Sequence, residues 1–427
     1  MKRLYRNGRI ATDSSSEPLK CDVLIEDVRI IGVAETIESV DGCEVIDCSG
    51  SVIVPALFDL NVHIRELGRE DREDITSCSE AAINGGFTGM VLQSDTNPAI
   101  DTGSAVQGVL DTCRDKSRIW QGVYTAGAIT KGGSGEELAA IAAMKSKGAV
   151  FLSEAGDPVI NPQLLRRAME YARQFDLPVA THGEVKELSG KGSMHEGAYS
   201  YSLGLQGIPA ISEEIGIARD VRLAEFCGVH LHVQQVSTRE GMSTVLRAKE
   251  RGIRVTCEVS PHHLIFNHSH IGNYDTHYKV NPPLRTEEDS VALLEGLRNG
   301  WIDVVACDHS PRTEFEKNQD FASAPFGVTG LETALPSLHH HFIKPGHFGW
   351  DVIVNRYSTG PRKFLSIPPV TIKEGHLAEF VVFNPNATVR FAREYLRSKS
   401  INTPFLNQTL SGQVERVIFR GAELLVR

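Results

Sequence analysis

The pattern of apolar and polar residues divides the chain into three parts. Residues 1–54 form short strand-like runs separated by turn residues such as Asn7-Gly8, and no helix of useful length fits there. After about residue 366 the same texture returns, for example in Val414–Phe419. We expect the two ends of the chain, residues 1–54 and 366–427, to pack together as one small β-sandwich.

Residues 55–365 alternate between short apolar runs and amphipathic stretches such as Pro162–Phe175 and Arg239–Arg251. Eight strands that alternate with helices over roughly 300 residues favour an α/β fold, a closed (β/α)8 TIM barrel, over an open sheet. The eight apolar runs are Ser51–Asp59, Gly89–Gln93, Trp120–Ala126, Val150–Ser153, Pro178–His182, His230–Val236, Arg254–Glu258 and Asp303–Asp308.

Polar side chains stand where several of these runs end. Positions i and i+2 of a strand project to the same face, so Asn61 and His63 point together out of the first run. Active sites of such barrels lie at the carboxyl ends of the strands. A single histidine there is usually a hydrogen-bonded core or surface residue. The residues His63, Glu154, His182 and Asp308 at one end of a barrel predict a functional constellation.

Composition and charge exclude several classes of protein. The net charge of -10 is spread without acidic or basic blocks, which argues against a nucleic-acid partner. The chain contains no stretch of about 18 apolar residues, so no membrane span is predicted. The N-terminus lacks the apolar core of a signal peptide. The eight cysteines have no CxxC spacing. Together these features predict a cytoplasmic protein with reduced thiols.

Family-specific motifs run through nearly the whole chain. They are FDLNVHIRELG (58–68), NGGFTGM (84–90), DTNPAID (95–101), GAITKG (127–132), LPVATHGE (177–184), GIPAISEEIGIARD (207–220), EVSPHH (258–263), KVNPPLRTEED (279–289), DVVACDHSP (303–311), APFGVTGLETALP (324–336) and INTPF (401–405). On these motifs the chain resembles the class I dihydroorotases of the amidohydrolase superfamily. This resemblance implies a barrel beside a β-sandwich and a zinc-dependent hydrolase that interconverts dihydroorotate and carbamoyl aspartate in pyrimidine biosynthesis.

The resemblance implies metal ligands at the strand ends, and two of them are changed. Where the family has His-x-His, this chain has Asn61-Val62-His63, and Gln235 replaces the His of the strand-six motif. Amides are weak ligands for zinc compared with imidazole. The ligands that remain are His63, His182, Asp308 and, if it reaches, Glu154, with Asp308 also as the catalytic proton shuttle. These residues could hold at most one zinc ion, and no metal at all is an equal expectation.

The residues that the family pattern assigns to substrate binding are also kept only in part. Arg65 matches the arginine that grips the substrate carboxylate as a bidentate fork, and Asn281 is kept. An asparagine of the family is Asp95 here, which puts a negative charge where an anionic substrate should sit. A histidine of the family is Arg312 here, which still attracts an anion. We predict these four residues to contact a small anionic pyrimidine precursor, if the protein is active.

Two functions follow from this pattern. The first is a pseudoenzyme, a dihydroorotase homologue with an impaired site that serves as a non-catalytic partner of aspartate carbamoyltransferase or assembles with itself. The second is an active cyclic amidohydrolase of dihydroorotase type with a reduced metal site. A hydantoinase is disfavoured because no lysine stands at the end of strand four to be carboxylated.

Overall fold

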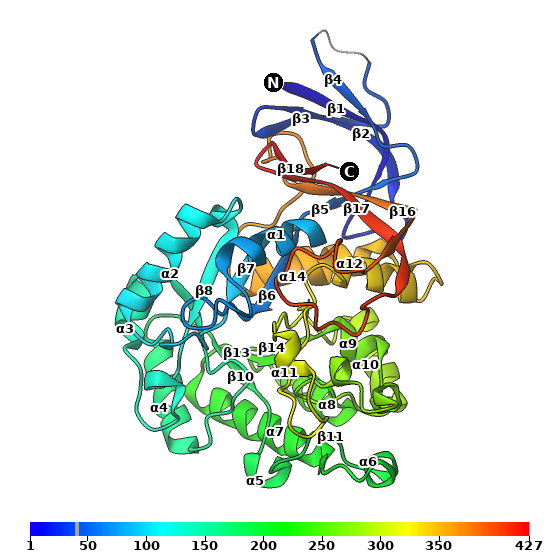
Figure 1. The fold of residues 1–427 in the computed structure, drawn as a ribbon. Coiled ribbons are helices and arrows are strands. Elements are labelled where there is room, and N and C mark those ends of the chain that lie inside the picture. The colour runs from blue at the N-terminus through cyan, green and yellow to red at the C-terminus, as the bar shows by residue number, and fades with distance from the viewer. Residues whose placement is uncertain (39–41, 427) are drawn as a thin grey trace.

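The computed structural model describes residues 1–38 and 42–426 as a parallel barrel beside a second sheet built from both chain ends (Figure 1). The barrel strands follow chain order: β6 (Leu57–Val62), β7 (Phe87–Leu92), β8 (Val123–Gly127), β9 (Ala149–Ser153), β10 (Val179–His182), β13 (Leu231–Gln234), β14 (Val255–Val259) and β15 (Val304–Val305). Each predicted apolar run overlaps one of these strands, which confirms the barrel.

Backbone hydrogen bonds close the barrel between its last and first strands. The amide of His63 donates to the carbonyl of His309 at 2.9 Å, and the amide of His309 donates to the carbonyl of Asn61 at 3.2 Å. The first predicted run divides in two, because its start, β5 (Val52–Pro55), joins the second sheet and its end becomes β6. This division links the two sheets through the residue Ala56.

Helices cover the outside of the barrel. Their ends follow local sequence signals, since Asn161 caps α4 ahead of Pro162 and Thr286 caps α10. The outer helices are α1 (Ile75–Gly85), α2 (Gly103–Lys116), α3 (Ile141–Ser146), α4 (Pro162–Arg173), α7 (Ala210–Cys227), α8 (Arg239–Glu250), α10 (Glu287–Asn299), α12 (Ala334–Leu338), α13 (Trp350–Ile353) and α14 (Gly360–Phe364), with π-helical turns at His339–Ile343 and Val354–Thr359.

Short elements lie in the loops that follow β8, β10, β14 and β15, on the side of the barrel mouth. Those after β10 contain a two-stranded ladder. The elements are α5 (Lys186–Ser189), β11 (Met194–His195), α6 (Ala198–Leu203), β12 (Gly207–Ile208), α9 (Pro261–Ile265), α11 (Glu314–Lys317) and the 3-10 turns Lys131–Gly133, His268–Ile271 and Thr276–Tyr278; a further 3-10 turn, Trp120–Gly122, precedes β8. Among the described residues, none of the helices has the length and apolar character to cross a bilayer.

The second sheet joins both chain ends, and Figure 1 shows its blue and red strands side by side above the barrel. Its core contains the rings of Tyr5 and Phe380, which meet edge to face with 4.9 Å between centroids. Its order is β18 (Ala422–Val426), β17 (Thr409–Phe419), β16 (Phe380–Arg390), β5, β1 (Lys2–Ile10), β2 (Leu19–Glu26) and β3 (Arg29–Ala34), and β4 (Glu44–Asp47) pairs with β1. The expected β unit is therefore one connected sheet.

The barrel interior is filled by apolar side chains that include Phe58, Phe151 and Phe364. Phe364 comes from α14, and its ring centroid lies 5.7 Å from that of Phe151 and 4.5 Å from that of His232. The end of the barrel opposite the mouth is thus partly closed by α14, a helix that follows the last strand.

We expect Phe364→Ala to lower the free energy of unfolding by about 3–5 kcal/mol, because it leaves a cavity that the rigid barrel cannot refill. Urea unfolding followed by circular dichroism measures this loss. Phe315→Ala is the matched control, since Phe315 is 83% exposed and its truncation should change stability by less than about 0.5 kcal/mol. Equal stability of the two variants would contradict the assignment of Phe364 to the barrel core.

Candidate active site

One pocket at the carboxyl ends of the barrel strands gathers most of the predicted site residues. Its cavity volume is about 250 Å³. Asn61 and His182 do not line it directly, although His182 lies 3.4 Å from the side chain of Asn281. The predicted residues that do line it are His63, Arg65, Asp95, Glu154, Gln235, Asn281, Asp308 and Arg312.

His63 lies between two carboxylates in this pocket. Its Nδ1 is 2.9 Å from Asp95 and its Nε2 is 3.4 Å from Asp308. Burial lowers the pKa of His63, but the two carboxylates outweigh it and raise the pKa to about 9. The imidazole of His63 thus pairs with both acids of the mouth.

Asp95 also pairs with the arginine that was predicted to bind the carboxylate of the substrate. Arg65 donates to Asp95 at 2.6 Å and to the hydroxyl of Ser310 at 3.0 Å. Burial would raise the pKa of Asp95, but Arg65 and His63 hold it well below its usual range. An internal carboxylate therefore takes the place on Arg65 that the resemblance gives to the carboxylate of the substrate.

Asn61 turns toward a buried carboxylate. Its amide nitrogen donates to Glu258 at 2.8 Å, and the other oxygen of Glu258 lies 3.0 Å from Nε2 of His232. The side-chain oxygen of Asn61 is buried without a hydrogen-bond partner among the described residues. The amide is thus held as a structural donor, and only its oxygen is left for another group.

A second cluster forms around Glu184. Its carboxylate lies 3.5 Å from His182, 3.3 Å from the amide of Asn281 and 2.9 Å from the ammonium of Lys186. Burial raises the pKa of Glu184, but His182, Ser189 and Lys186 hold it well below its usual range. The sequence-based prediction missed Glu184 and Lys186, although Glu184 follows His182 by two positions and belongs to the same family motif.

Glu154 lines the pocket but faces the loop after β8. It accepts a hydrogen bond from the backbone amide of Thr130. Burial raises the pKa of Glu154 to about 7. Within the described residues its hydrogen bond goes to this loop and not to His63, His182 or Asp308.

Three strand ends at the mouth have a left-handed backbone. The φ angle is 56° at Ala155, 52° at Gln235 and 50° at Asp308. Each of these residues has a Cβ atom, so each conformation costs free energy, of order 1–3 kcal/mol. Such strain clusters at functional sites. Here it changes the direction of the backbone at the positions where the family motifs lie.

Arg312 begins a loop that covers one side of the pocket. Its Nε donates to the carbonyl of Phe326 at 2.8 Å. Burial, together with the nearby Arg65 and Arg72, lowers the pKa of Arg312 to about 9, which leaves the guanidinium charged at neutral pH. The loop thus keeps a positive charge at the rim of the mouth.

The buried side chain of Lys317 holds this loop in place through hydrogen bonds. Its ammonium donates to the carbonyls of Gly327 at 3.0 Å and Pro325 at 3.1 Å, and the residue is 3% exposed. Burial and the neighbouring charges of Arg312 and Lys279 lower the pKa of Lys317 to about 7. The folded protein therefore releases this proton at a lower pH than the unfolded chain does.

We expect the stability of the protein to rise with pH above 7 because of Lys317. The unfolded lysine has a pKa of about 10.4, so between about pH 7 and 10 the unfolded state binds more protons. The slope from this group is at most about 1.4 kcal/mol per pH unit. Urea unfolding at pH 7, 8 and 9 measures it, and Lys317→Met should flatten the profile. Lys145→Met, at an exposed position, should leave the slope unchanged. Parallel profiles for all three proteins would contradict this assignment.

The donors at the mouth do not fit a catalytic zinc centre in this arrangement. A catalytic zinc is held by three protein ligands, and no group of three or more His, Cys, Asp or Glu side chains in the described part of the chain is placed to hold a metal. His63 lies between Asp95 and Asp308, and His182 pairs with Glu184. The oxygen of Asn61 is a weak additional donor.

Comparisons with known proteins identify the family. Residues 50–241 match the model of dihydro-orotase-like proteins. The dihydroorotase of Solibacter usitatus is 40% identical over 421 residues, covering 99% of this chain and 97% of the relative. The dihydroorotase of Carboxydothermus hydrogenoformans is 39% identical over 423 residues, with the same coverage. The chain belongs to the dihydroorotase family.

Solved structures agree with this fold. The L-hydantoinase (dihydropyrimidinase) of Arthrobacter aurescens has a TM-score of 0.88 at 22% identity, covering 99% of this chain and 96% of the other. The dihydropyrimidinase of Brevibacillus agri has a TM-score of 0.83 at 22% identity, covering 100% and 95%. At such identities the likeness shows the fold alone. The full-length relatives confirm the family resemblance and the solved structures confirm the fold, while the roles of the individual mouth residues stay predictions.

Proposed function

We propose that this dihydroorotase-family protein is impaired in hydrolysis and acts in pyrimidine biosynthesis as a non-catalytic partner. The observation that carries the proposal is the side chain of Asn61, which donates to Glu258 in the position where the family pattern has a ligand histidine. Gln235 is a second amide in a ligand position. Losing two imidazole ligands should weaken zinc binding far more than losing a residue that only hydrogen-bonds to a ligand. Loss of such a residue typically lowers metal affinity or activity about 10–100-fold.

The arrangement around Arg65 supports the same proposal. A substrate carboxylate would have to displace Asp95 from Arg65 at 2.6 Å and also approach a second negative charge, Asp308. Both steps cost free energy, because Asp95 would lose a charge-assisted hydrogen bond in a buried site. Within the described residues the acids and bases of the pocket pair with one another, although Nε of Arg65 and one oxygen of Asp95 have no hydrogen-bond partner.

The proposed partner is aspartate carbamoyltransferase, with self-assembly as the other form of association. Support comes from the contrast between a fold kept over nearly the full length of the relatives and a mouth altered at Asn61, Asp95 and Gln235. A fold kept intact around an altered mouth is what a scaffolding role requires, since binding to a partner uses the surface of the barrel.

The second candidate is an active cyclic amidohydrolase that converts dihydroorotate to carbamoyl aspartate with a reduced metal site. The full-length relatives are named dihydroorotases, which supports this candidate more directly than it supports impairment. The pair of His63 and Asp308 is kept, and Asp308 would move the proton in such an enzyme. At most one zinc ion would be held, by His63, His182 and Asp308, and by Glu154 once it turned inward.

Restoring both histidines tests the first proposal. We expect the wild type to carry well under one zinc per chain and to leave dihydroorotate unhydrolysed, and Asn61→His/Gln235→His to move toward about one zinc per chain. Glu258 would accept the second N–H of a histidine at position 61, as carboxylates do for zinc-bound imidazoles. Mass spectrometry of untagged protein prepared without chelators measures the metal, and Asn318→His, at an exposed loop position, is the control.

The same measurement decides between the candidates. A wild type with about one zinc per chain, lost in His63→Ala and in Asp308→Ala together with dihydroorotate hydrolysis, would establish the second candidate. A wild type without zinc or activity, and a double variant that gains zinc, would support the first.

The partner role needs a separate test. We expect the chain and the aspartate carbamoyltransferase of the same cell, expressed together, to elute as one complex in size-exclusion chromatography with light scattering. We expect this because a family member that lacks hydrolase activity would be kept for its role in a protein complex. An unrelated enzyme of similar size is the control. Separate elution at micromolar concentrations would contradict the partner role without touching the zinc result.

A further inference from the structure

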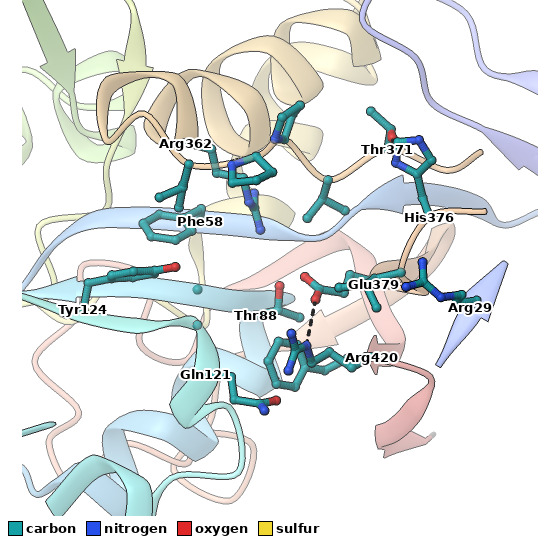
Figure 2. Close-up of a pocket in the computed structure, with 18 of the residues that line it drawn as sticks. Arg29, Phe58, Thr88, Gln121, Tyr124, Arg362, Thr371, His376, Glu379 and Arg420 are labelled. Carbon is teal, nitrogen blue, oxygen red and sulfur yellow. Dashed lines mark hydrogen bonds and ion pairs between the residues drawn. The ribbon is translucent and has the colours of Figure 1, made fainter. Parts of the chain in front are cut away.

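A second cavity lies at the opposite end of the barrel from the mouth (Figure 2). Its volume is about 510 Å³. It is bounded by the amino-terminal ends of β6, β7 and β8, by the segment that follows α14, and by the second sheet where β16 begins and β17 ends. This end of such a barrel ordinarily serves stability, so a roomy and charged cavity here calls for an explanation.

The charge of the cavity is opposite to that of the protein. The chain carries a net charge of -10, yet the side chains lining the cavity include Arg29, Arg362 and Arg420 against one acid, Glu379. Arg420 and Glu379 are 3.9 Å apart, at the limit of an ion pair. Positive charge in a concave, partly apolar site concentrates anions.

Arg362 is the most deeply buried of these arginines, at 4% exposure. Its Nη1 donates to the carbonyls of Ser358 at 2.8 Å and Ala56 at 3.0 Å, and its guanidinium lies 5.1 Å from the ring centroid of Phe58. Within the described chain its Nε and Nη2 have no hydrogen-bond acceptor, and Figure 2 shows the guanidinium pointing into the cavity. A buried arginine held by one nitrogen offers the others to a ligand.

Thr88 is a second buried group without a partner. It is 1% exposed, lines the cavity, and its hydroxyl makes no hydrogen bond in the described part of the structure. Buried hydroxyl groups in proteins are nearly always satisfied, so an orphan at a cavity wall indicates an additional acceptor or donor there. Figure 2 places Thr88 beside Glu379, between the arginines and the aromatic wall.

The remaining wall is aromatic. Phe58 and Tyr124 lie side by side with 5.8 Å between ring centroids, and Phe419 lines the cavity from the second sheet. Flat rings stack well on such surfaces, and arginine favours ligands that combine a ring with an anion. Glu379 could accept an N–H group of a heterocycle.

We propose that this cavity is a binding site for a small anion with a planar heterocyclic ring, of the size and chemistry of a nucleoside monophosphate. The anionic group meets Arg362, Arg29 and Arg420, and the ring lies against Phe58 and Tyr124. The volume lies within the range of about 300–1,000 Å³ that is typical of small-molecule sites. The proposal is independent of whether the mouth hydrolyses anything, since the two sites share no lining residue.

Isothermal titration calorimetry on the full chain tests this site, with uridine 5′-monophosphate and adenosine 5′-monophosphate as probes and uridine and inorganic phosphate as partial probes. We expect saturable binding of at least one nucleotide and at least about tenfold weaker binding of both partial probes, because each lacks one half of the contacts. Arg420→Gln should weaken nucleotide binding about tenfold, the usual effect of losing one hydrogen bond to a charged group.

Thr88→Val tests the orphan hydroxyl without disturbing a described hydrogen bond, and we expect about threefold to tenfold weaker binding. Arg254→Gln is the matched control, because Arg254 lies at the same end of the barrel, pairs with Asp176 and does not line the cavity. Asp308→Asn at the mouth should also leave binding unchanged. Thermal unfolding verifies that each variant is folded.

Three outcomes would overturn the proposal. The first is no saturable binding of either nucleotide at millimolar concentration. The second is binding that Arg420→Gln and Thr88→Val leave unchanged in folded protein. The third is binding lost in Asp308→Asn, which would place the nucleotide at the mouth.

Discussion

The closure of the barrel between its last and first strands is the constraint on which both sites depend. The hydrogen bonds of His63 and Asn61 with His309 bring residues about 250 positions apart into one ring of strands. Without that ring, the carboxyl ends of β6, β9, β10 and β15 would not meet, and their amino-terminal ends would not face the second sheet. The mouth and the opposite cavity are thus two consequences of one closed sheet.

The charged side chains at the mouth compensate one another. His63, Arg65, Asp95 and Asp308 form a continuous chain of opposite charges. Buried acids must be paired or bound to a metal, because an isolated charge in a protein interior is too costly. Here the side chains of Arg65 and His63 pair with these acids, at positions where the resemblance implies a metal and a substrate. The change of asparagine to Asp95 is central, since this carboxylate engages both His63 and Arg65.

The cavity at the other end shows how the second sheet contributes more than stability. Its residues Arg29, Glu379 and Arg420 complete a wall that the barrel residues Phe58 and Arg362 begin. β6 contains Phe58, which lines this cavity, and ends at Val62, directly before His63 at the mouth, so one strand leads from one site to the other. The two ends of the protein are therefore connected through one short, fully buried element.

The sequence by itself determined the class of fold and the membership of the candidate site. Apolar runs of four to nine residues alternating with amphipathic segments admit few arrangements, and strand ends mark the mouth, so His63, Glu154 and Asp308 could be assigned to one pocket, to which the family resemblance added Arg65. His182, predicted in the same way, does not line that pocket, and Glu184 and Lys186 were missed. Only the tertiary structure decided how these side chains pair. The capture of Arg65 by Asp95, the contact of Asn61 with Glu258 and the cavity behind the barrel depend on side chains from distant segments, whose directions no local pattern encodes.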